Sequence, residues 1–374
     1  MTSFVLKDSA NPSIHAFVVG VGAYSHLSGG TSENKLAVDM GQLDAAHDSA
    51  VAVWEWLYKG IPTNPALPVG SIEILLSPTT STKTNLTGIE VDRADSTNMQ
   101  SAFDRWFDRC QRNEKNVALF YFCGHGLENG DKYLLLEDFG ANERKLFENS
   151  INFDQFYAGM RGCSASTQCF FLDCCRSNAK ILRERAQVAA MSLIDTFAEN
   201  LNKQREAPVI YSTASGLAAW APDTGLTRYT QALLDCLNGL GSEKINGKWR
   251  VTTGRLGLAM ESVLNQNPLE EQFCVSDGDR GDQRSTLVVL NNPPTIKLRV
   301  DTLPNQFIRE LTFSLSNTLL PQHYERSTPD PNPWELNVTA ASYVLRAVRN
   351  GQNVLAEEDL LAIPPSQIRT FEGP

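Results

Sequence analysis

The chain has 374 residues, of which 42% are hydrophobic; this is enough for a sizeable core and excludes a disordered or collagen-like protein. Its 33 basic and 43 acidic residues give a formal net charge of −10, which is a poor match for nucleic-acid phosphates. Residues 1–13 do not resemble a signal peptide, and no apolar stretch approaches the ~18 residues that span a bilayer. We therefore expect neither a nucleic-acid nor a membrane partner. Eight cysteines in so long a chain predict reduced thiols and a cytoplasmic location.

The first 290 residues alternate between strand-like and helix-like patterns. Short apolar runs predict strands at residues 14–22, 71–77, 117–123, 168–173 and 208–212. Apolar residues at helical spacing predict helices over residues 44–58, 99–110, 190–201 and 229–240. This alternation predicts an α/β domain over residues 1–290, with a mostly parallel sheet and helices on both faces.

The last part of the chain has a different pattern. The sequence NNPP at residues 291–294 predicts a linker. After it, strand-like runs at residues 295–300, 308–316 and 334–346 are separated by proline-rich loops. We therefore expect a small β-sandwich-like domain over residues 295–374.

Two of the apolar strands end in chemically reactive residues. The strand at 117–123 continues into GHG at 124–126, and the strand at 168–173 continues into CCR at 174–176. Because ligands bind outside the carboxyl ends of strands in an open parallel sheet, both sequences are expected at the edge where sites form. A cysteine beside an imidazole can become a thiolate, which is the nucleophilic form. The alternative is a packed strand with a core cysteine and a histidine that only satisfies its hydrogen bonds.

These two sequences resemble known motifs. Residues 121–126 (YFCGHG) and 173–177 (DCCRS) resemble the catalytic motifs of the caspase-like cysteine peptidases, which include caspases, metacaspases and their bacterial relatives. Further likenesses to that family follow in the expected order at residues 17–24, 46–50, 212–215 and 225–234. The resemblance covers residues 14–290 and implies the caspase-like fold for them; the C-terminal domain lies outside it.

The resemblance implies a cysteine endopeptidase. Cys175 is then the nucleophile, His125 is the general acid–base, and the backbone N–H groups of Gly126 and Cys175 form the oxyanion hole. Cys174, where the family usually has Ala or Ser, is the rival nucleophile or else a packing residue. One alternative function is a catalytically silent caspase-fold scaffold that acts through its C-terminal domain, but the intact His125 and Cys175 favour an enzyme. Peptide ligation through the same thioester is another alternative.

Substrate preference follows from the same resemblance. Caspases prefer an acidic residue before the cut, whereas metacaspases prefer Arg or Lys. Asp173 and Asp48 match the two acids of the metacaspase S1 pocket, and Cys123 replaces a serine of that pocket. Two carboxylates can hold a guanidinium through charge-assisted bonds. At about 100° per residue, Asp48 points away from the apolar face of its helix, toward solvent or a site. A solvated carboxylate favoured by the helix N-terminus is the alternative for Asp48. We expect protein substrates cut after Arg, with Lys second.

The stretch after the nucleophile suggests regulation. In caspases, precursor cleavage occurs after the catalytic cysteine, and this chain carries Arg183, Arg185, Lys203 and Arg205 there. These residues are autocleavage candidates, and a helix with a basic face is the alternative. The resemblance also suggests an activating protease or regulatory partner and a bacterial stress or antiviral defence role. No metal-binding spacing or nucleotide-binding loop is present, so no cofactor is predicted. Many metacaspases require calcium, and the sequence leaves that requirement open.

Overall fold

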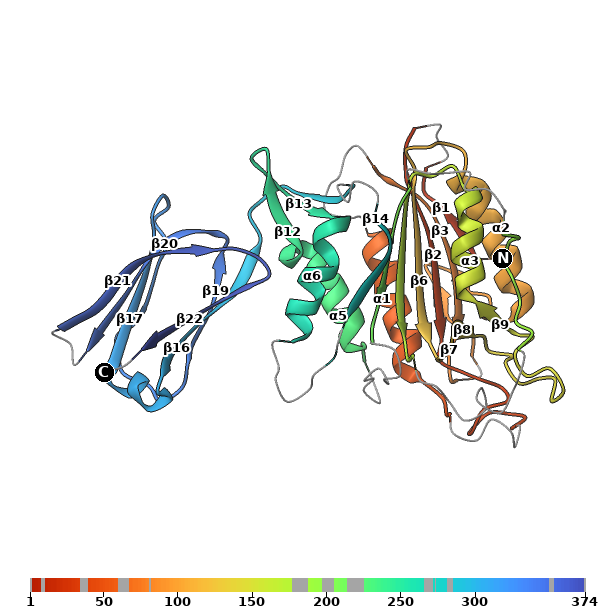
Figure 1. Cartoon of the computed structure of the whole chain (residues 1–374), viewed down its shortest axis with the longest axis horizontal. Helices are drawn as coiled ribbons and strands as arrows, with labels where there is room; N and C mark the ends of the chain where they lie inside the picture. The colour runs from red at the N-terminus through yellow and green to blue at the C-terminus, as the bar shows by residue number, and fades with distance from the viewer. Residues whose placement is uncertain are drawn as a thin grey trace.

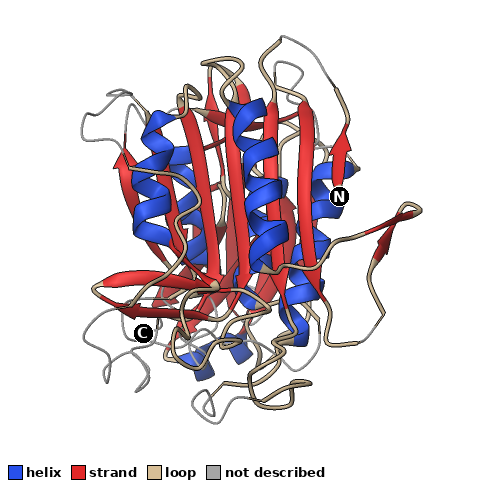
Figure 2. Cartoon of the chain, turned by 90° about the vertical axis from the view of Figure 1, so that its right-hand side faces the viewer, coloured by secondary structure: helices blue, strands red, loops and turns tan. Residues whose placement is uncertain are grey.

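The computed structural model places a β-sheet at the centre of the first 290 residues (Figures 1 and 2). In the part of the chain that the structure describes, seven strands form this sheet in the order β1-β3-β2-β6-β10-β11-β14. Strands β2, β3, β6, β10 and β11 run parallel, and the edge strands β1 and β14 pair antiparallel. The strands are β1 (Ser3–Val5), β2 (Ile14–Val21), β3 (Val69–Ser77), β6 (Val117–Gly124), β10 (Thr167–Cys174), β11 (Glu206–Tyr211) and β14 (Val275–Arg280). The described residues are 2–7, 11–33, 40–59, 67–80, 82–176, 188–196, 205–213, 225–265, 272, 274–280, 285–349 and 353–372.

Helices cover both faces of the sheet, as the sequence predicts. Figure 1 shows α1, α5 and α6 on one face and α2 and α3 on the other. Their bounds are α1 (Asp44–Tyr58), α2 (Ser96–Cys110), α3 (Phe153–Gly159), α5 (Arg228–Asp235) and α6 (Thr253–Leu264). A short 3-10 turn, η2 (Met160–Gly162), follows α3, and a π-helical turn, η3 (Cys236–Leu240), continues α5. Among the described residues, no helix is long and apolar enough to cross a membrane.

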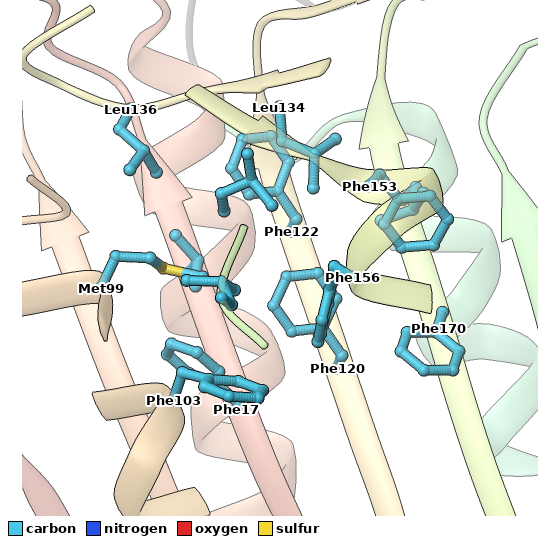
Figure 3. Close-up of a cluster of buried hydrophobic side chains, with 14 of the residues drawn as sticks. Phe17, Met99, Phe103, Phe120, Phe122, Leu134, Leu136, Phe153, Phe156 and Phe170 are labelled. Carbon is cyan, nitrogen blue, oxygen red and sulfur yellow. The ribbon is translucent and has the colours of Figure 1, made fainter. Parts of the chain in front are cut away.

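Side chains that alternate along each strand fill two separate cores. On β6, Phe120 and Phe122 enter the core on the α2–α3 side, whereas Leu119 and Tyr121 enter the core on the α1–α5 side. Figure 3 shows the first core, where rings from β6, β10 and α3 lie together. The Phe120 and Phe156 rings meet edge to face, with centroids 5.1 Å apart. Burial on both faces explains why these strands are continuously apolar.

Smaller sheets surround the central one. Strands β7 (Gly126–Asn129), β8 (Asp131–Leu135) and β9 (Ser150–Asn152) form an antiparallel sheet directly after β6. Strands β12 (Ser242–Ile245), β13 (Lys248–Thr252) and β15 (Thr286–Leu290) form another next to the linker. A short hairpin joins β4 (Asn85–Leu86) and β5 (Ile89–Glu90).

Two sheets pack face to face in the C-terminal part, as predicted. Within its described residues, β19-β16-β22 form one sheet and β18-β17-β20-β21 form the other. They enclose a core of their own, which includes Phe313, Trp334 and Phe371. The elements are β16 (Thr295–Leu303), η4 (Asn305–Glu310), β17 (Leu311–Asn317), β18 (His323–Arg326), β19 (Trp334–Thr339), β20 (Ala341–Arg349), β21 (Asn353–Ala362) and β22 (Ser366–Glu372).

The helix predicted over residues 190–201 is wrong for residues 190–196; residues 197–201 lie outside the described residues. Instead, Met191 forms a parallel bridge to Ile151 of β9. The Met191 N–H donates to the Ser150 carbonyl at 2.9 Å, and its own carbonyl accepts from Asn152 N–H at 3.1 Å. Backbone pairing with β9 therefore replaces the helical hydrogen bonds that the apolar spacing suggested.

Candidate active site

The strand register brings the two reactive motifs together. Strands β6 and β10 are parallel neighbours, and the last two aligned pairs are Asp173 with Cys123 and Cys174 with Gly124. The residue that follows β10 is Cys175, and the residue that follows β6 is His125. Because neighbouring strands lie about 4.8 Å apart, these residues leave the sheet side by side at its carboxyl edge. The prediction that the two motifs meet at this edge is confirmed.

The two adjacent cysteines have different surroundings. Cys174 is 4% exposed and belongs to the core on the α2–α3 side. Burial raises the pKa of its thiol well above the ordinary value, so that the thiolate is disfavoured. Cys175 lies beyond the end of β10 and is partly exposed. These surroundings favour Cys175 over Cys174 as the reactive thiol.

Hydrogen bonds fix both the backbone and the ring of His125. Its Nε2 lies 2.8 Å from the carbonyl oxygen of Gly41, just before α1, and its backbone N–H donates to the Tyr24 hydroxyl at 2.6 Å. The Tyr24 and His125 ring centroids are 4.8 Å apart. A carbonyl can only accept, so Nε2 carries the proton, and Nδ1 is the unprotonated nitrogen of the neutral ring. Burial lowers the pKa of His125, while the Gly41 carbonyl opposes that shift.

Gly126 lies close to the cysteine loop. A Cβ atom at this position would be 2.6 Å from the Cys175 carbonyl oxygen and 2.8 Å from the Cys174 sulfur. Only glycine therefore fits this position without movement of the neighbouring loop. The close approach places the Gly126 backbone beside the Cys175 carbonyl group; the oxyanion hole stays a prediction.

Asp173 is a buried carboxylate next to this edge. It is 3% exposed, and its Oδ2 accepts hydrogen bonds from the hydroxyls of Thr227 and, at 2.7 Å, of Thr230. Thr227 also caps α5, because its Oγ1 accepts from the Thr230 N–H at 3.1 Å. Burial raises the pKa of Asp173, and the hydroxyl bonds partly oppose the shift. Asp173 is thus a buried carboxyl group near the carboxyl edge of the sheet, on the face that α1 and α5 cover.

The other two predicted S1 residues differ in exposure. Asp48 points away from the core, as the helical geometry predicts; its side chain is 48% exposed, and its Oδ1 lies 3.0 Å from His47 Nδ1. Cys123 is 2% exposed, and its thiol contacts the Asp173 carboxylate. Burial raises the pKa of the thiol, and the negative charge of Asp173 raises it further. The next residue after Asp48, Ser49, accepts from the Thr227 N–H at 3.0 Å. Asp48 is therefore adjacent to a residue of α1 that binds Thr227, and the hydroxyl of Thr227 in turn donates to Asp173.

A comparison with known protein families identifies the family of this chain. The sequence matches the caspase domain family over residues 81–271, which is just over half of the chain and includes both motifs. The chain belongs to the caspase domain family. This family comprises cysteine peptidases. The match begins after α1, so Asp48 lies outside it.

Two individual proteins are similar to this caspase domain chain. An uncharacterised protein of Sinorhizobium fredii, y4kE, is 28% identical over 281 residues, covering 69% of this chain and 80% of that protein. Among solved structures, caspase-1 from Spodoptera frugiperda has 10% sequence identity and a TM-score of 0.40, covering 76% of this chain and 92% of that chain.

An ion pair joins the segments that follow Cys175 and His125 in the caspase domain. Arg176, the residue after Cys175, donates from Nε and Nη2 to the two carboxylate oxygens of Glu128 in β7, at 2.8 and 3.0 Å. Its guanidinium also stacks on the Tyr211 ring, with Cζ 4.4 Å from the centroid. Both charged side chains are more than four-fifths buried, at 13% and 14% exposure. This bidentate pair holds the cysteine loop against the strand that follows His125.

The predicted autocleavage residues have different outcomes. Arg183, Arg185 and Lys203 lie outside the described residues. Arg205 is described, and the prediction that it is a cleavage site is wrong for the folded chain, because its side chain is 1% exposed. Its Nε donates to Asp279 at 2.8 Å, and Nη1 donates to Gln168 Oε1 at 3.1 Å. A residue held in this way at the start of β11 cannot enter an active site without local unfolding.

Proposed function

We propose that this caspase domain protein is a cysteine endopeptidase that cleaves proteins after basic residues, with Arg preferred over Lys. Cys175 is the nucleophile, and His125 is the general acid–base. The observation that carries the proposal is the register of β6 and β10, which puts these residues side by side past two parallel strands. The partial exposure of Cys175 and the fixed ring of His125 support the same roles.

In the proposed reaction, the Cys175 sulfur attacks the carbonyl carbon of the scissile peptide bond, and its proton passes to His125 Nδ1. Backbone N–H groups of Gly126 and Cys175 bind the oxyanion, each contributing about 3–4 kcal/mol to the transition state. His125 then gives its proton to the leaving amine, the C–N bond breaks, and a thioester remains. Water that loses a proton to His125 hydrolyses the thioester and restores the free thiol.

The direction of the His125 pKa shift predicts the pH dependence. His125 must be neutral to accept the proton of Cys175, so kcat/KM rises as pH increases through the pKa of this ring. Burial lowers that pKa, so we expect the midpoint of the acidic limb below the ordinary histidine value of about 6.5. A pH–rate profile on an Arg peptide measures this midpoint. A limb centred at or above the ordinary value contradicts the assignment.

The same shift predicts how stability depends on pH. A histidine whose pKa is lower in the folded chain binds fewer protons there than in the unfolded chain, between the folded value and about 6.5. Its contribution to stability is therefore complete above about pH 6.5. That contribution is lost as the pH falls toward the pKa of His125 in the folded chain. Chemical unfolding of the wild type and His125→Asn across this range measures the difference.

The proposed specificity depends on two carboxylates on one side of the sheet. Asp173 is buried beneath the edge, and Asp48 is exposed on the first turns of α1. An Arg side chain that reaches between α1 and α5 would meet the exposed carboxylate first and the buried one at its guanidinium end. The hydroxyls of Thr227 and Thr230 orient Asp173 for this contact. A caspase-like preference for an acidic residue would place two like charges against each other here.

A positional-scanning peptide library tests the specificity. We expect Asp173→Asn to lower kcat/KM for Arg peptides by about 10–100-fold, because one charge-assisted hydrogen bond is lost. Asp48→Asn should give a smaller loss, because this carboxylate is solvated. Asp104→Asn, an exposed change on α2, is the matched control. At pH 7 the stability of Asp173→Asn should stay within about 1 kcal/mol of the wild type, because burial already penalises the charged form.

The library also separates the alternatives. Cleavage after Asp but not Arg would contradict the proposed acidic S1 pocket. An irreversible thiol inhibitor with Arg at its reactive position should label Cys175 in the wild type and nothing in Cys175→Ala. Failure to label the wild-type chain, together with no hydrolysis, would support a catalytically silent scaffold that acts through its C-terminal domain.

We further propose that the chain processes itself after Arg183, Arg185 or Lys203. All three follow the nucleophile in sequence and would fit the same acidic S1 pocket. Intact-mass spectrometry of the wild type should show fragments that end at these residues, and Cys175→Ala should stay whole. The pair Arg183→Ala and Arg185→Ala should move the cut to Lys203. Identical uncut masses under conditions that activate the wild type would contradict self-processing.

A further inference from the structure

The imidazole of His125 belongs to a closed network of hydrogen bonds. The ring Nε2 bonds to the Gly41 carbonyl at 2.8 Å, while the His125 backbone N–H donates to the Tyr24 hydroxyl at 2.6 Å. Gly41 and Tyr24 lie in the same connection between β2 and α1, Tyr24 just after β2 and Gly41 just before α1. The orientation of the imidazole therefore depends on how the two ends of this connection are held relative to each other.

One side chain, Gln42, joins the two ends of this connection. Its Oε1 accepts from the Tyr24 N–H at 2.8 Å, and its Nε2 donates to the Tyr24 carbonyl at 3.1 Å. The same Nε2 donates to the Ser28 carbonyl at 2.9 Å. The side-chain amide thus pairs with the Tyr24 backbone as a neighbouring strand would, using both its donor and its acceptor.

This link acts directly on the Gly41 carbonyl. Residues 40–43 form neither helix nor strand, so no regular ladder fixes the peptide plane between Gly41 and Gln42. Two backbone bonds flank it, from Ser28 N–H to the Met40 carbonyl at 3.1 Å and from Leu43 N–H to the Gly22 carbonyl at 2.8 Å. Because Gln42 follows Gly41 immediately, its three side-chain bonds act together with these two backbone bonds to hold that carbonyl.

We propose that Gln42 is a positioning residue for the catalytic histidine. Through Gly41 and Tyr24 it holds the imidazole in the form with the proton on Nε2, which leaves Nδ1 as the base on the side of Cys175. This inference rests on the proposed role of His125 in catalysis. In this role Gln42 does not contact the reacting atoms. It acts only through the Gly41 carbonyl and the Tyr24 hydroxyl, which hold His125.

Two substitutions test the role. Gln42→Ala removes all three bonds, and Gln42→Glu keeps the volume and one acceptor but cannot donate to Tyr24 or Ser28. We expect both to lower kcat by about 100-fold with KM nearly unchanged, because a small misplacement of a catalytic group has this effect. Gln111→Ala, an exposed glutamine at the end of α2, should keep wild-type kinetics. Thermal unfolding identifies any variant that fails to fold.

Tyr24→Phe tests the other part of this hydrogen-bond network, the contact between Tyr24 and the His125 backbone. It removes only the hydroxyl that accepts from the His125 backbone. If Gln42 and Tyr24 act as one unit, the double variant Gln42→Glu with Tyr24→Phe should be no slower than the slower single variant. Losses that multiply would mean that the two residues act independently, and they would overturn the proposal.

A readout without turnover completes the test. Long-range ¹H–¹⁵N NMR spectra of the His125 ring, recorded in Cys175→Ala, show which nitrogen carries the proton. We expect Nε2–H in that background and a mixture of both forms once Gln42→Glu is added. An unchanged proton position would overturn the proposal even if activity falls. If no peptide is hydrolysed but the proton position changes, the positioning role stands and the peptidase assignment fails.

Discussion

We expect Cys175→Ala to abolish peptide hydrolysis and Cys174→Ala to keep kcat/KM within a few-fold of the wild type. Loss of a nucleophile removes the covalent route, and the expected decrease in kcat is on the order of 10⁶-fold. Cys174 is 4% exposed within a core, where it contributes packing. We expect Cys174→Ala to lower the unfolding free energy by about 1 kcal/mol, because a buried sulfur is lost.

Rates on an Arg peptide, thermal unfolding and mass spectrometry after iodoacetamide treatment check this pair. Iodoacetamide should modify Cys175 in the native chain and leave Cys174 unmodified until the chain unfolds. The assignment is contradicted if Cys174→Ala is inactive while Cys175→Ala hydrolyses the peptide. Equal alkylation of both thiols in the folded chain would also contradict the difference in burial on which the assignment depends.

The central sheet could be predicted because its strands are continuously apolar and its main helices have long apolar faces. The helix over residues 44–58 forms with the predicted bounds, and its buried positions include Ala46, Ala50, Val53 and Leu57 at helical spacing. Helices α3 and α6 were not predicted. The first has seven residues, too few for periodicity to appear, and the second contains glycines that weaken the pattern.

The segment at 188–196 shows why apolar spacing alone can mislead. Leu193 and Ile194 have helical spacing with Ala190, but tertiary contacts bury them without a helix. Ile194 packs against Gly159, where a Cβ would come within 2.5 Å of the isoleucine side chain. The same pattern of apolar residues is therefore compatible with a docked extended segment, and only the neighbouring elements decide between the two.

The site could be predicted where its chemistry lies in side chains at strand ends. His125 and Cys175 stand out because each directly follows an apolar strand. The Gly41 carbonyl has no side-chain signature, and the importance of Gln42 arises from contacts with Tyr24, at the other end of the connection between β2 and α1, which no sequence pattern indicates. Arg205 shows the reverse case: its positive charge suggests a cleavage site, yet its ion pair and its burial exist only in the folded chain.

We expect Gly126→Ala to reduce activity strongly while leaving the fold intact. The new methyl group would be 2.6 Å from the Cys175 carbonyl oxygen and 2.8 Å from the Cys174 sulfur, far inside contact distance. The cysteine loop must therefore move away from the backbone that follows His125. A displacement of about 1 Å can reduce the rate about 100-fold, and weakening of the oxyanion hole adds to that loss. We expect kcat to fall by about 10³-fold or more, with a smaller effect on KM.

Gly130→Ala, in the turn between β7 and β8, is the matched control. This glycine has a φ of +80°, and a Cβ there meets no atom within 4 Å. The alanine should cost about 1–2 kcal/mol of stability, because an L-residue is strained in this conformation, but it should leave kcat unchanged. Peptide kinetics and thermal unfolding of both variants separate the two effects. If Gly126→Ala keeps full activity, the two catalytic loops do not depend on their close contact, and the proposed oxyanion hole cannot include the Gly126 N–H in its observed position.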